Sequence, residues 1–163
     1  GRRRIIHGTG KLLWAHDVLH QKEFEATITS KVPRGYVYPA ELSGVTAKLK
    51  QHGIETIELD KKLKLTGEEF KISKFIKSQR AAYGGHNTVK LEGEFEAGKK
   101  TCAKGSIYVD MAQPLAMLAF YLLEPQSDDG LVYWNYFDDY LVQNKVESGK
   151  LKYPVLKIYD PID

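Results

Sequence analysis

Residues 36–59 read YVYPAELSGVTAKLKQHGIETIEL, and this stretch decides the fold class. Its first three residues predict a short strand, because aromatic and β-branched side chains favour extended chain. The middle predicts a helix, because apolar residues recur on one face while lysine and glutamine occupy the other. These apolar residues are Leu42, Val45 and Leu49. Gly53 then predicts the end of the helix, since glycine adopts the left-handed conformation without a steric penalty.

A second strand is predicted directly after this helix, over residues 54–59. The order strand, helix, strand is a β-α-β unit, whose two strands would lie parallel if they share a sheet. The rest of the chain predicts antiparallel ribbon and further helix. The expected strands are 24–32, 63–65, 70–72, 89–96, 101–103, 106–109 and 153–159, with turns at 66–68 and 98–100, a helix over 114–123, and helical spacing over 131–141.

These patterns predict an α+β fold: a single domain with a mixed β-sheet, a β-α-β unit, antiparallel hairpins and two or three helices. A chain of 163 residues is long enough for one core and too short for two ordinary domains. Pro154 would place the final strand at an edge or put the proline at a strand start, because proline cannot donate a ladder hydrogen bond.

The charge pattern argues against a nucleic-acid partner. The 24 basic and 21 acidic residues alternate in sign through most of the strands, which indicates a solvated face and not a phosphate track. No apolar run approaches the roughly 20 residues that a membrane span needs. We therefore expect neither nucleic-acid binding nor a membrane span.

A search for catalytic metal ligands finds few candidates. His16, His20 and Glu23 lie close together, and His20 with Glu23 matches the His-x-x-Glu spacing of zinc carboxypeptidases. A catalytic zinc needs three protein ligands and an open position, and the downstream histidines, His52 and His86, are scattered. We expect no metal ligands and no catalytic residues in this chain.

The other reactive side chains predict structural roles. Cys102 is the sole cysteine, so an intramolecular disulfide is impossible, and its place in a probable strand indicates an apolar filler. The acidic pairs at 128–129 and 138–139 could serve glycoside hydrolysis or calcium binding, but neither pattern is completed. The first pair is expected to cap a helix, where carboxylates stabilise the N-terminus.

The aromatic run of residues 133–140 is the most distinctive part of the composition. On a helix, Trp134 and Phe137 would face the core, and the tyrosines at i, i+3 and i+7 would lie near the surface. These tyrosines, Tyr133, Tyr136 and Tyr140, could stack a sugar or dock a neighbouring domain. The alternative is ordinary packing with the phenol hydroxyls in water.

A glycine-containing loop, residues 78–86, supplies two further candidates for a contact. It has no apolar periodicity, which is typical of irregular chain. Its Tyr83 and His86 are treated as possible contacts with a ligand or a neighbouring domain.

Four segments carry a resemblance to a known family: QPLA at 113–116, LLEPQSDDGLVYWN at 122–135, YVYPA at 36–40 and LKQHGI at 49–54. They resemble the region that follows the catalytic domain in bacterial secreted zinc carboxypeptidases of the carboxypeptidase A type. The motifs are structural in character, so they indicate family membership and not a mechanism. The implied parent enzyme removes C-terminal residues from peptides with one zinc ion, whose ligands lie in the preceding domain.

The resemblance implies that residues 1–163 form an accessory domain that stabilises or orients the catalytic domain or its substrate. The implied partner is the preceding catalytic domain, with peptide or glycan as a further ligand, in an extracellular or periplasmic location. Zinc would belong to the parent and no cofactor to this chain. Gly1 stands where a chain start would have Met, so the sequence is expected to be a piece of a longer chain, with residues 1–23 as an extension or linker to the preceding domain. The alternative is a carbohydrate or cell-envelope binding module built on the tyrosine face.

Overall fold

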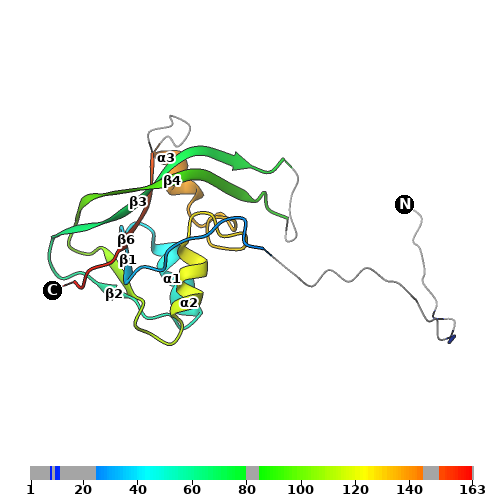
Figure 1. Ribbon diagram of the computed structural model, residues 1–163, viewed down its shortest axis with the longest axis horizontal. Coiled ribbons are helices and arrows are strands. Elements are labelled where there is room, and N and C mark those ends of the chain that lie inside the picture. The colour runs from blue at the N-terminus through cyan, green and yellow to red at the C-terminus, as the bar shows by residue number, and fades with distance from the viewer. Residues whose placement is uncertain (1–7, 9, 12–24, 80–84, 145–150, 163) are drawn as a thin grey trace.

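A six-stranded sheet with three helices forms the fold, as Figure 1 shows for the computed structural model. The structure describes residues 8, 10–11, 25–79, 85–144 and 151–162. In chain order the elements are β1 (Gly35–Tyr38), α1 (Ser43–Gln51), β2 (Ile57–Glu58), β3 (Leu63–Lys77), β4 (Val89–Cys102), β5 (Ile107–Asp110), α2 (Ala116–Leu123), α3 (Asp138–Gln143) and β6 (Lys152–Ile158). The predicted α+β class is confirmed.

The strand order in the sheet is β2-β5-β1-β6-β3-β4, and every neighbouring pair is antiparallel. The prediction of a mixed sheet is therefore wrong for the described strands. The β-α-β unit exists in a split form: β1 and β2 both pair antiparallel with β5, which lies between them. They run parallel to each other without sharing hydrogen bonds, because a strand from later in the chain is inserted between them.

The turns predicted at 66–68 and 98–100 are wrong. Gly67 and Gly98 face each other within the long β3–β4 ribbon, which continues through both positions. A Cβ atom on Gly67 would lie 2.0 Å from the carbonyl oxygen of Lys157 in β6. The glycine is needed there because another backbone approaches closely, and not because the chain reverses.

Three other predicted elements are shorter than expected or absent. Residues 25–32 form no strand, and residue 24 lies outside the described part of the chain. The strand predicted over 54–59 shrinks to β2. The helix predicted over 131–141 begins only at Asp138, because Asn135 has a left-handed backbone with φ of 68° and residues before it form turns.

The helices cover one face of the sheet, and alternate strand residues divide between two apolar clusters. The larger cluster joins Tyr36 and Tyr38 to the predicted core face of α1, where Val45 and Leu49 are fully buried. It also includes the buried residues of α2. A smaller cluster on the opposite face contains Val37 of β1, Leu59, Cys102 and residues of β5 and β6. The period of two along β1 thus places its side chains alternately in both clusters.

Cys102 and the final strand both lie in the interior of the fold. Cys102 is buried in the smaller cluster, as predicted, and burial raises the pKa of its thiol. The last strand, β6, lies between β1 and β3, so of the two alternatives predicted for Pro154 the edge position is wrong and the position near the strand start holds. Pro154 is tolerated near the start of β6, where the β3–β6 register shifts between Glu69 and Lys71.

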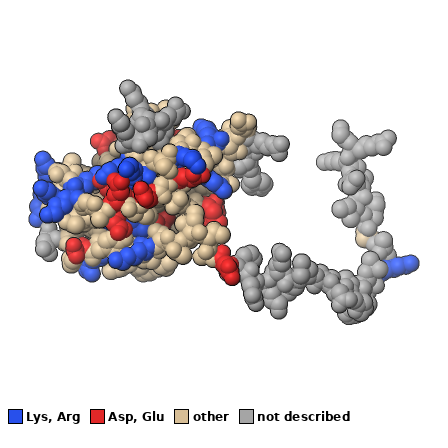
Figure 2. Space-filling model, turned by 45° about the horizontal axis from the view of Figure 1, so that its top comes forward, with Lys and Arg blue, Asp and Glu red and all other residues tan. Residues whose placement is uncertain are grey.

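The surface carries both signs of charge. Figure 2 shows basic and acidic side chains next to one another over the visible face. The carboxylate of Glu69, for example, lies 2.8 Å from the Lys100 ammonium group and 2.9 Å from that of Lys152. Burial alone would raise the pKa of Glu69, but these two lysines outweigh it and hold that pKa below its usual value. Within the described residues, no helix is long and apolar enough to cross a membrane.

Candidate functional site

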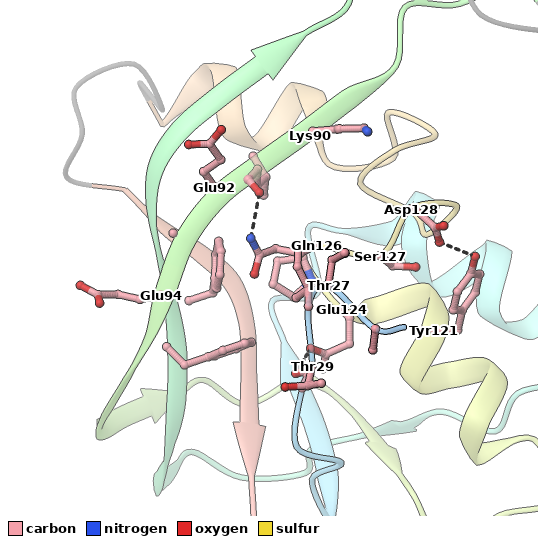
Figure 3. A pocket seen from close by; sticks show the side chains of 18 of the residues that line it. Thr27, Thr29, Lys90, Glu92, Glu94, Tyr121, Glu124, Gln126, Ser127 and Asp128 are labelled. Carbon is pink, nitrogen blue, oxygen red and sulfur yellow. Dashed lines mark hydrogen bonds between the residues drawn. The ribbon is translucent and has the colours of Figure 1, made fainter. Parts of the chain in front are cut away.

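An open groove of about 630 Å³ lies between the edge of β4 and the turn that follows α2 (Figure 3). Three segments that are distant in sequence supply most of its lining: residues 25–30, residues 90–95 of β4 and residues 120–128. Its volume falls within the range of pockets that bind small molecules or short peptide segments, about 300–1,000 Å³. The groove is the first candidate for a binding site.

The floor of the groove is aromatic, and its rim is polar. Phe70 is fully buried, and its ring centroid lies 5.1 Å from that of Phe95 in an edge-to-face arrangement. On the rim, the Tyr121 hydroxyl donates to Asp128 over 2.8 Å. The side-chain amide of Gln126 donates to the backbone carbonyl of Leu91 over 3.3 Å. Gln126 thereby connects the turn after α2 to β4.

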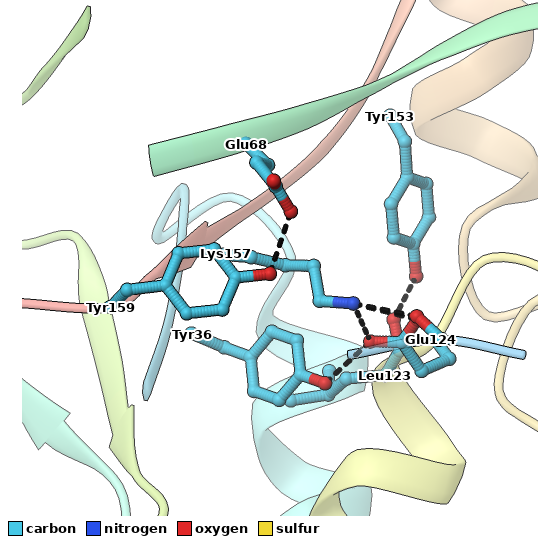
Figure 4. A network of polar contacts seen from close by, with 8 residues as sticks. Tyr36, Glu68, Leu123, Glu124, Tyr153, Lys157 and Tyr159 are labelled. Carbon is cyan, nitrogen blue, oxygen red and sulfur yellow. Dashed lines mark hydrogen bonds and ion pairs between the residues drawn. The ribbon is translucent and has the colours of Figure 1, made fainter. Parts of the chain in front are cut away.

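Glu124, one of the residues that line the groove, forms a buried ion pair with Lys157 of β6 (Figure 4). The Lys157 ammonium group lies 2.8 Å from the Glu124 carboxylate, and the two residues are 2% and 6% exposed. The hydroxyls of Tyr36 and Ser30 each donate to the same carboxylate over 2.5 Å. Lys157 also donates to the Ser30 hydroxyl over 2.7 Å and lies 4.2 Å from the centroid of the Phe95 ring. The two charges are therefore compensated by each other and by hydrogen bonds.

The network also changes the acidity of Tyr36. Burial and the neighbouring Glu124 carboxylate both raise the pKa of its hydroxyl, so Tyr36 remains a hydrogen-bond donor. The carboxylate therefore accepts from Tyr36, Ser30 and Lys157 together. This arrangement joins β1, the turn after α2 and β6 to the segment that precedes β1.

The sequence analysis missed Glu124 and Lys157, although a signal was present. Each is a single charged residue inside an apolar run, LLEP at 122–125 and VLKI at 155–158. On β6, Lys157 shares its face with Tyr153 and Val155, which belong to the larger core cluster. Charged residues are almost never fully buried unless they are paired, so two such residues indicate a buried pair.

The predicted tyrosine face does not form as a helical stripe. Residues 131–137 are turns, and Tyr136 is 38% exposed while Tyr133 and Tyr140 are half-buried. Tyr140 packs against the core, and burial raises the pKa of its hydroxyl. Trp134 is also 38% exposed, so the prediction that it faces the core is wrong. Phe137 is buried, as predicted.

The structure brings His86 to this aromatic segment. The His86 ring lies 4.5 Å from the Trp134 ring, centroid to centroid, and its Nδ1 is 2.6 Å from Oδ1 of Asn135. Since the Asn135 amide nitrogen donates to Asn87 and Asp138, its oxygen is the acceptor and Nδ1 of His86 carries the proton. Nε2 of His86 and Oδ1 of Asp138 are buried without a hydrogen-bond partner among the described residues. Tyr83 lies outside the described residues.

The first acidic pair, which was expected to cap a helix, instead accepts hydrogen bonds from two side chains, because residues 131–137 form turns and no helix follows it directly. Asp128 accepts from Tyr121, and Asp129 accepts from the indole nitrogen of Trp134 over 2.5 Å. The second pair, Asp138 and Asp139, lies in the first turn of α3, where negative charge favours the helix dipole.

The residues suggested as metal ligands from sequence spacing, His16, His20 and Glu23, lie outside the described residues. Within the described ranges, no three His, Cys, Asp or Glu side chains are grouped closely enough to hold a metal ion.

The fold and the groove define this chain as an α+β domain with an antiparallel sheet and an open groove whose lining includes one member of a buried ion pair. Compared with protein-family models, with curated proteins and with solved structures, the chain has no match in any of the three searches.

Proposed function

We propose that this chain is the non-catalytic C-terminal domain of a secreted zinc carboxypeptidase, in which it orients the catalytic domain or its peptide substrate. The resemblance of the segments QPLA at 113–116 and LLEPQSDDGLVYWN at 122–135 supplies the family. Zinc belongs to the preceding catalytic domain, which is the partner of this one, and the location is extracellular or periplasmic.

The observation that carries the orienting role is the attachment of residues 25–34, the segment that leads into the sheet. Ser30 is hydrogen-bonded to both members of the buried ion pair, Glu124 and Lys157. Its neighbour Lys31 lies over the Tyr159 ring at 4.2 Å. At the end of the segment, the Arg34 amide donates to the carbonyl of Ile158 over 2.8 Å. The segment is thus fixed to the domain by side chains and by backbone.

Such an attachment matters because linked domains move relative to each other unless their connection is held. Because residues 30–34 are fixed to the sheet, the direction in which the chain enters the domain is fixed there as well. Residues 25–30 also line the groove, so a ligand in the groove would contact the connection itself. Orientation of the preceding domain and binding of a substrate would then depend on the same few residues.

The isolated chain is expected to be unable to trim peptides, even with added zinc, because the zinc ligands and the general base of the family lie in the preceding domain. Mass spectrometry of peptides with varied C-terminal residues measures this directly. The protein encoded together with its upstream region should trim the same peptides and stop when a chelator is added. Chelator-sensitive trimming by the isolated chain would contradict the proposal, as would an upstream region without His-x-x-Glu and a distant histidine.

A second candidate function, carbohydrate binding, is favoured by the exposure of Trp134. Its indole ring is held on two sides, by the hydrogen bond to Asp129 and by the His86 ring. A fixed, exposed aromatic ring offers a large contact area at a low entropy cost, which is what stacking on a sugar requires.

If this second function holds, a glycan array should identify a ligand, and Trp134→Ala should abolish its binding. The matched control is Tyr121→Ala, which removes an exposed aromatic ring from α2 and should leave binding unchanged. An array without a ligand, or unchanged binding by Trp134→Ala, would exclude carbohydrate binding at this surface.

A further inference from the structure

β4 is a long strand at one edge of the sheet. It has 14 residues, whereas β2 at the opposite edge has 2. An edge strand presents a row of backbone N–H and C=O groups that another extended chain can pair with. The groove described above runs along the first half of this edge, beside residues 90–95.

Hydrogen bonds at the start of β4 show which of its peptide groups point away from β3. The amide of Val89 donates to the carbonyl of Tyr133 over 3.4 Å, and the carbonyl of Leu91 accepts from Gln126. Neither partner belongs to β3. Because peptide groups alternate in direction along an antiparallel strand, every second residue from Val89 onward points outward.

The hydrogen bonds of β3 independently show that the peptide groups of β4 also point outward at Gly93, two residues after Leu91. Ile72 lies opposite Gly93, and its amide donates to Leu151 on the far side of β3. Ile72 and Gly93 therefore form a pair without mutual hydrogen bonds, and the peptide groups of Gly93 and Phe95 point out from β4. Among the described residues, no hydrogen bond reaches these outward groups.

The side chains along this edge alternate between two environments. Leu91 and Phe95 belong to the core side, which forms the apolar floor of the groove. Figure 3 shows Glu92 and Glu94 pointing the other way, away from Gln126. A strand added beside β4 would therefore have one apolar and one acidic set of neighbours.

Glu92, Glu94 and Glu96 form an acidic row on β4, and two of these glutamates pair with lysines of β3. Glu92 forms an ion pair with Lys74 of β3 at 2.6 Å, and Glu96 forms one with Lys71 at 2.9 Å. Between them, Glu94 has no ion-pair partner among the described residues. Opposite charges on neighbouring strands stabilise a sheet, so a basic residue on an added strand would be favoured beside Glu94.

We propose that an extended peptide with alternating basic and apolar residues binds in the groove as a seventh strand beside β4. Its backbone pairs with the outward peptide groups of Gly93 and Phe95. Its basic side chains lie beside Glu94, and its apolar side chains lie over Phe95 and Phe120. Within the groove, the free part of this edge runs from Gly93 to Phe95, because the outward carbonyl of Leu91 already accepts from Gln126. This binding depends on this chain alone and goes beyond the accessory role proposed above.

The test uses a fluorescent octapeptide in which lysine and valine alternate, titrated into the whole chain. We expect saturable binding, with amide NMR shifts largest at Gly93 and Phe95. Two further peptides separate the contributions: the same sequence N-methylated at alternate residues, and a version with glutamate in place of lysine. Both should bind at least about tenfold more weakly, because one loses its backbone donors and the other repels Glu94.

The variant Glu94→Lys should weaken binding of the lysine peptide by about tenfold. The matched control is Glu58→Lys, which makes the same charge change on the exposed edge strand β2 and should leave affinity within about twofold. Absence of binding, equal binding of the N-methylated peptide, or unchanged affinity of Glu94→Lys would each overturn the proposal. Self-association through β4, seen as a dimer by sedimentation and lost in Glu94→Lys, would also overturn it. None of these outcomes depends on whether a peptidase domain precedes the chain.

Discussion

The variant Glu124→Leu is expected to lose about 3–5 kcal/mol of unfolding free energy, because it leaves the buried ammonium group of Lys157 without a counter-charge. The same change removes the acceptor of the hydrogen bonds from Tyr36 and Ser30. A buried donor without an acceptor cannot return to water while the domain stays folded, so its desolvation is uncompensated. Chemical denaturation of the chain, followed by circular dichroism, measures the loss.

Two further variants show whether this loss comes from the uncompensated charge. In the double variant Glu124→Leu with Lys157→Met, both charges are replaced by apolar groups, and most of the stability should return. The matched single change is Lys74→Met, which breaks the exposed pair with Glu92 and should cost less than about 1 kcal/mol. If Glu124→Leu costs no more than Lys74→Met, the ion pair is not buried as described. If the double variant is as unstable as Glu124→Leu, the loss of unfolding free energy arises from poorer packing of the new side chain and not from the unpaired charge.

Helices α1 and α2 were predictable because the information for them is local. Leu42 directly before α1, and Val45 and Leu49 within it, lie on one apolar face, and all three are buried as their spacing predicts. Gly53 has a φ of 82°, the left-handed conformation predicted for the residue that ends the helix. Neither property requires knowledge of any distant part of the chain.

The groove and the ion pair could not be predicted in this way, because they join segments that are far apart in the sequence. Glu124 and Lys157 are separated by 33 positions, and Ser30 precedes Lys157 by 127. The isolated charges in apolar runs indicate that a buried pair exists, but they do not indicate which other segments of the chain are hydrogen-bonded to it. The tyrosine face failed for a local reason: the left-handed Asn135 interrupts the helix on which the spacing depended.

Gly67 and Gly98 of the β3–β4 ribbon also show that the local sequence cannot reveal contacts with a distant segment. A glycine between polar residues favours a turn, and it equally permits the close approach of another strand. The sequence around Gly67 is consistent with both. What decides between them is β6, which passes beside Gly67 and comes from the other end of the chain.

Gly67→Ala is therefore expected to cost about 1–3 kcal/mol of unfolding free energy, since the strands must move apart to admit the new methyl group. The matched control lies directly across the ribbon: Gly98 pairs with Gly67, and a Cβ atom there would have no neighbour within 4 Å. Gly98→Ala should be neutral or slightly stabilising, because alanine restricts the unfolded chain more than glycine does. Thermal and chemical denaturation of the two variants give the comparison.

Equal stability of Gly67→Ala and Gly98→Ala would mean that β6 does not run beside Gly67. The carbonyl group that approaches Gly67 belongs to Lys157, the same residue that forms the buried ion pair with Glu124. A displaced β6 would therefore also move the ammonium group away from Glu124 and Ser30. The two largest expected effects thus both depend on the position of β6. If Gly67→Ala proves as stable as Gly98→Ala, the loss of stability in Glu124→Leu should be small as well.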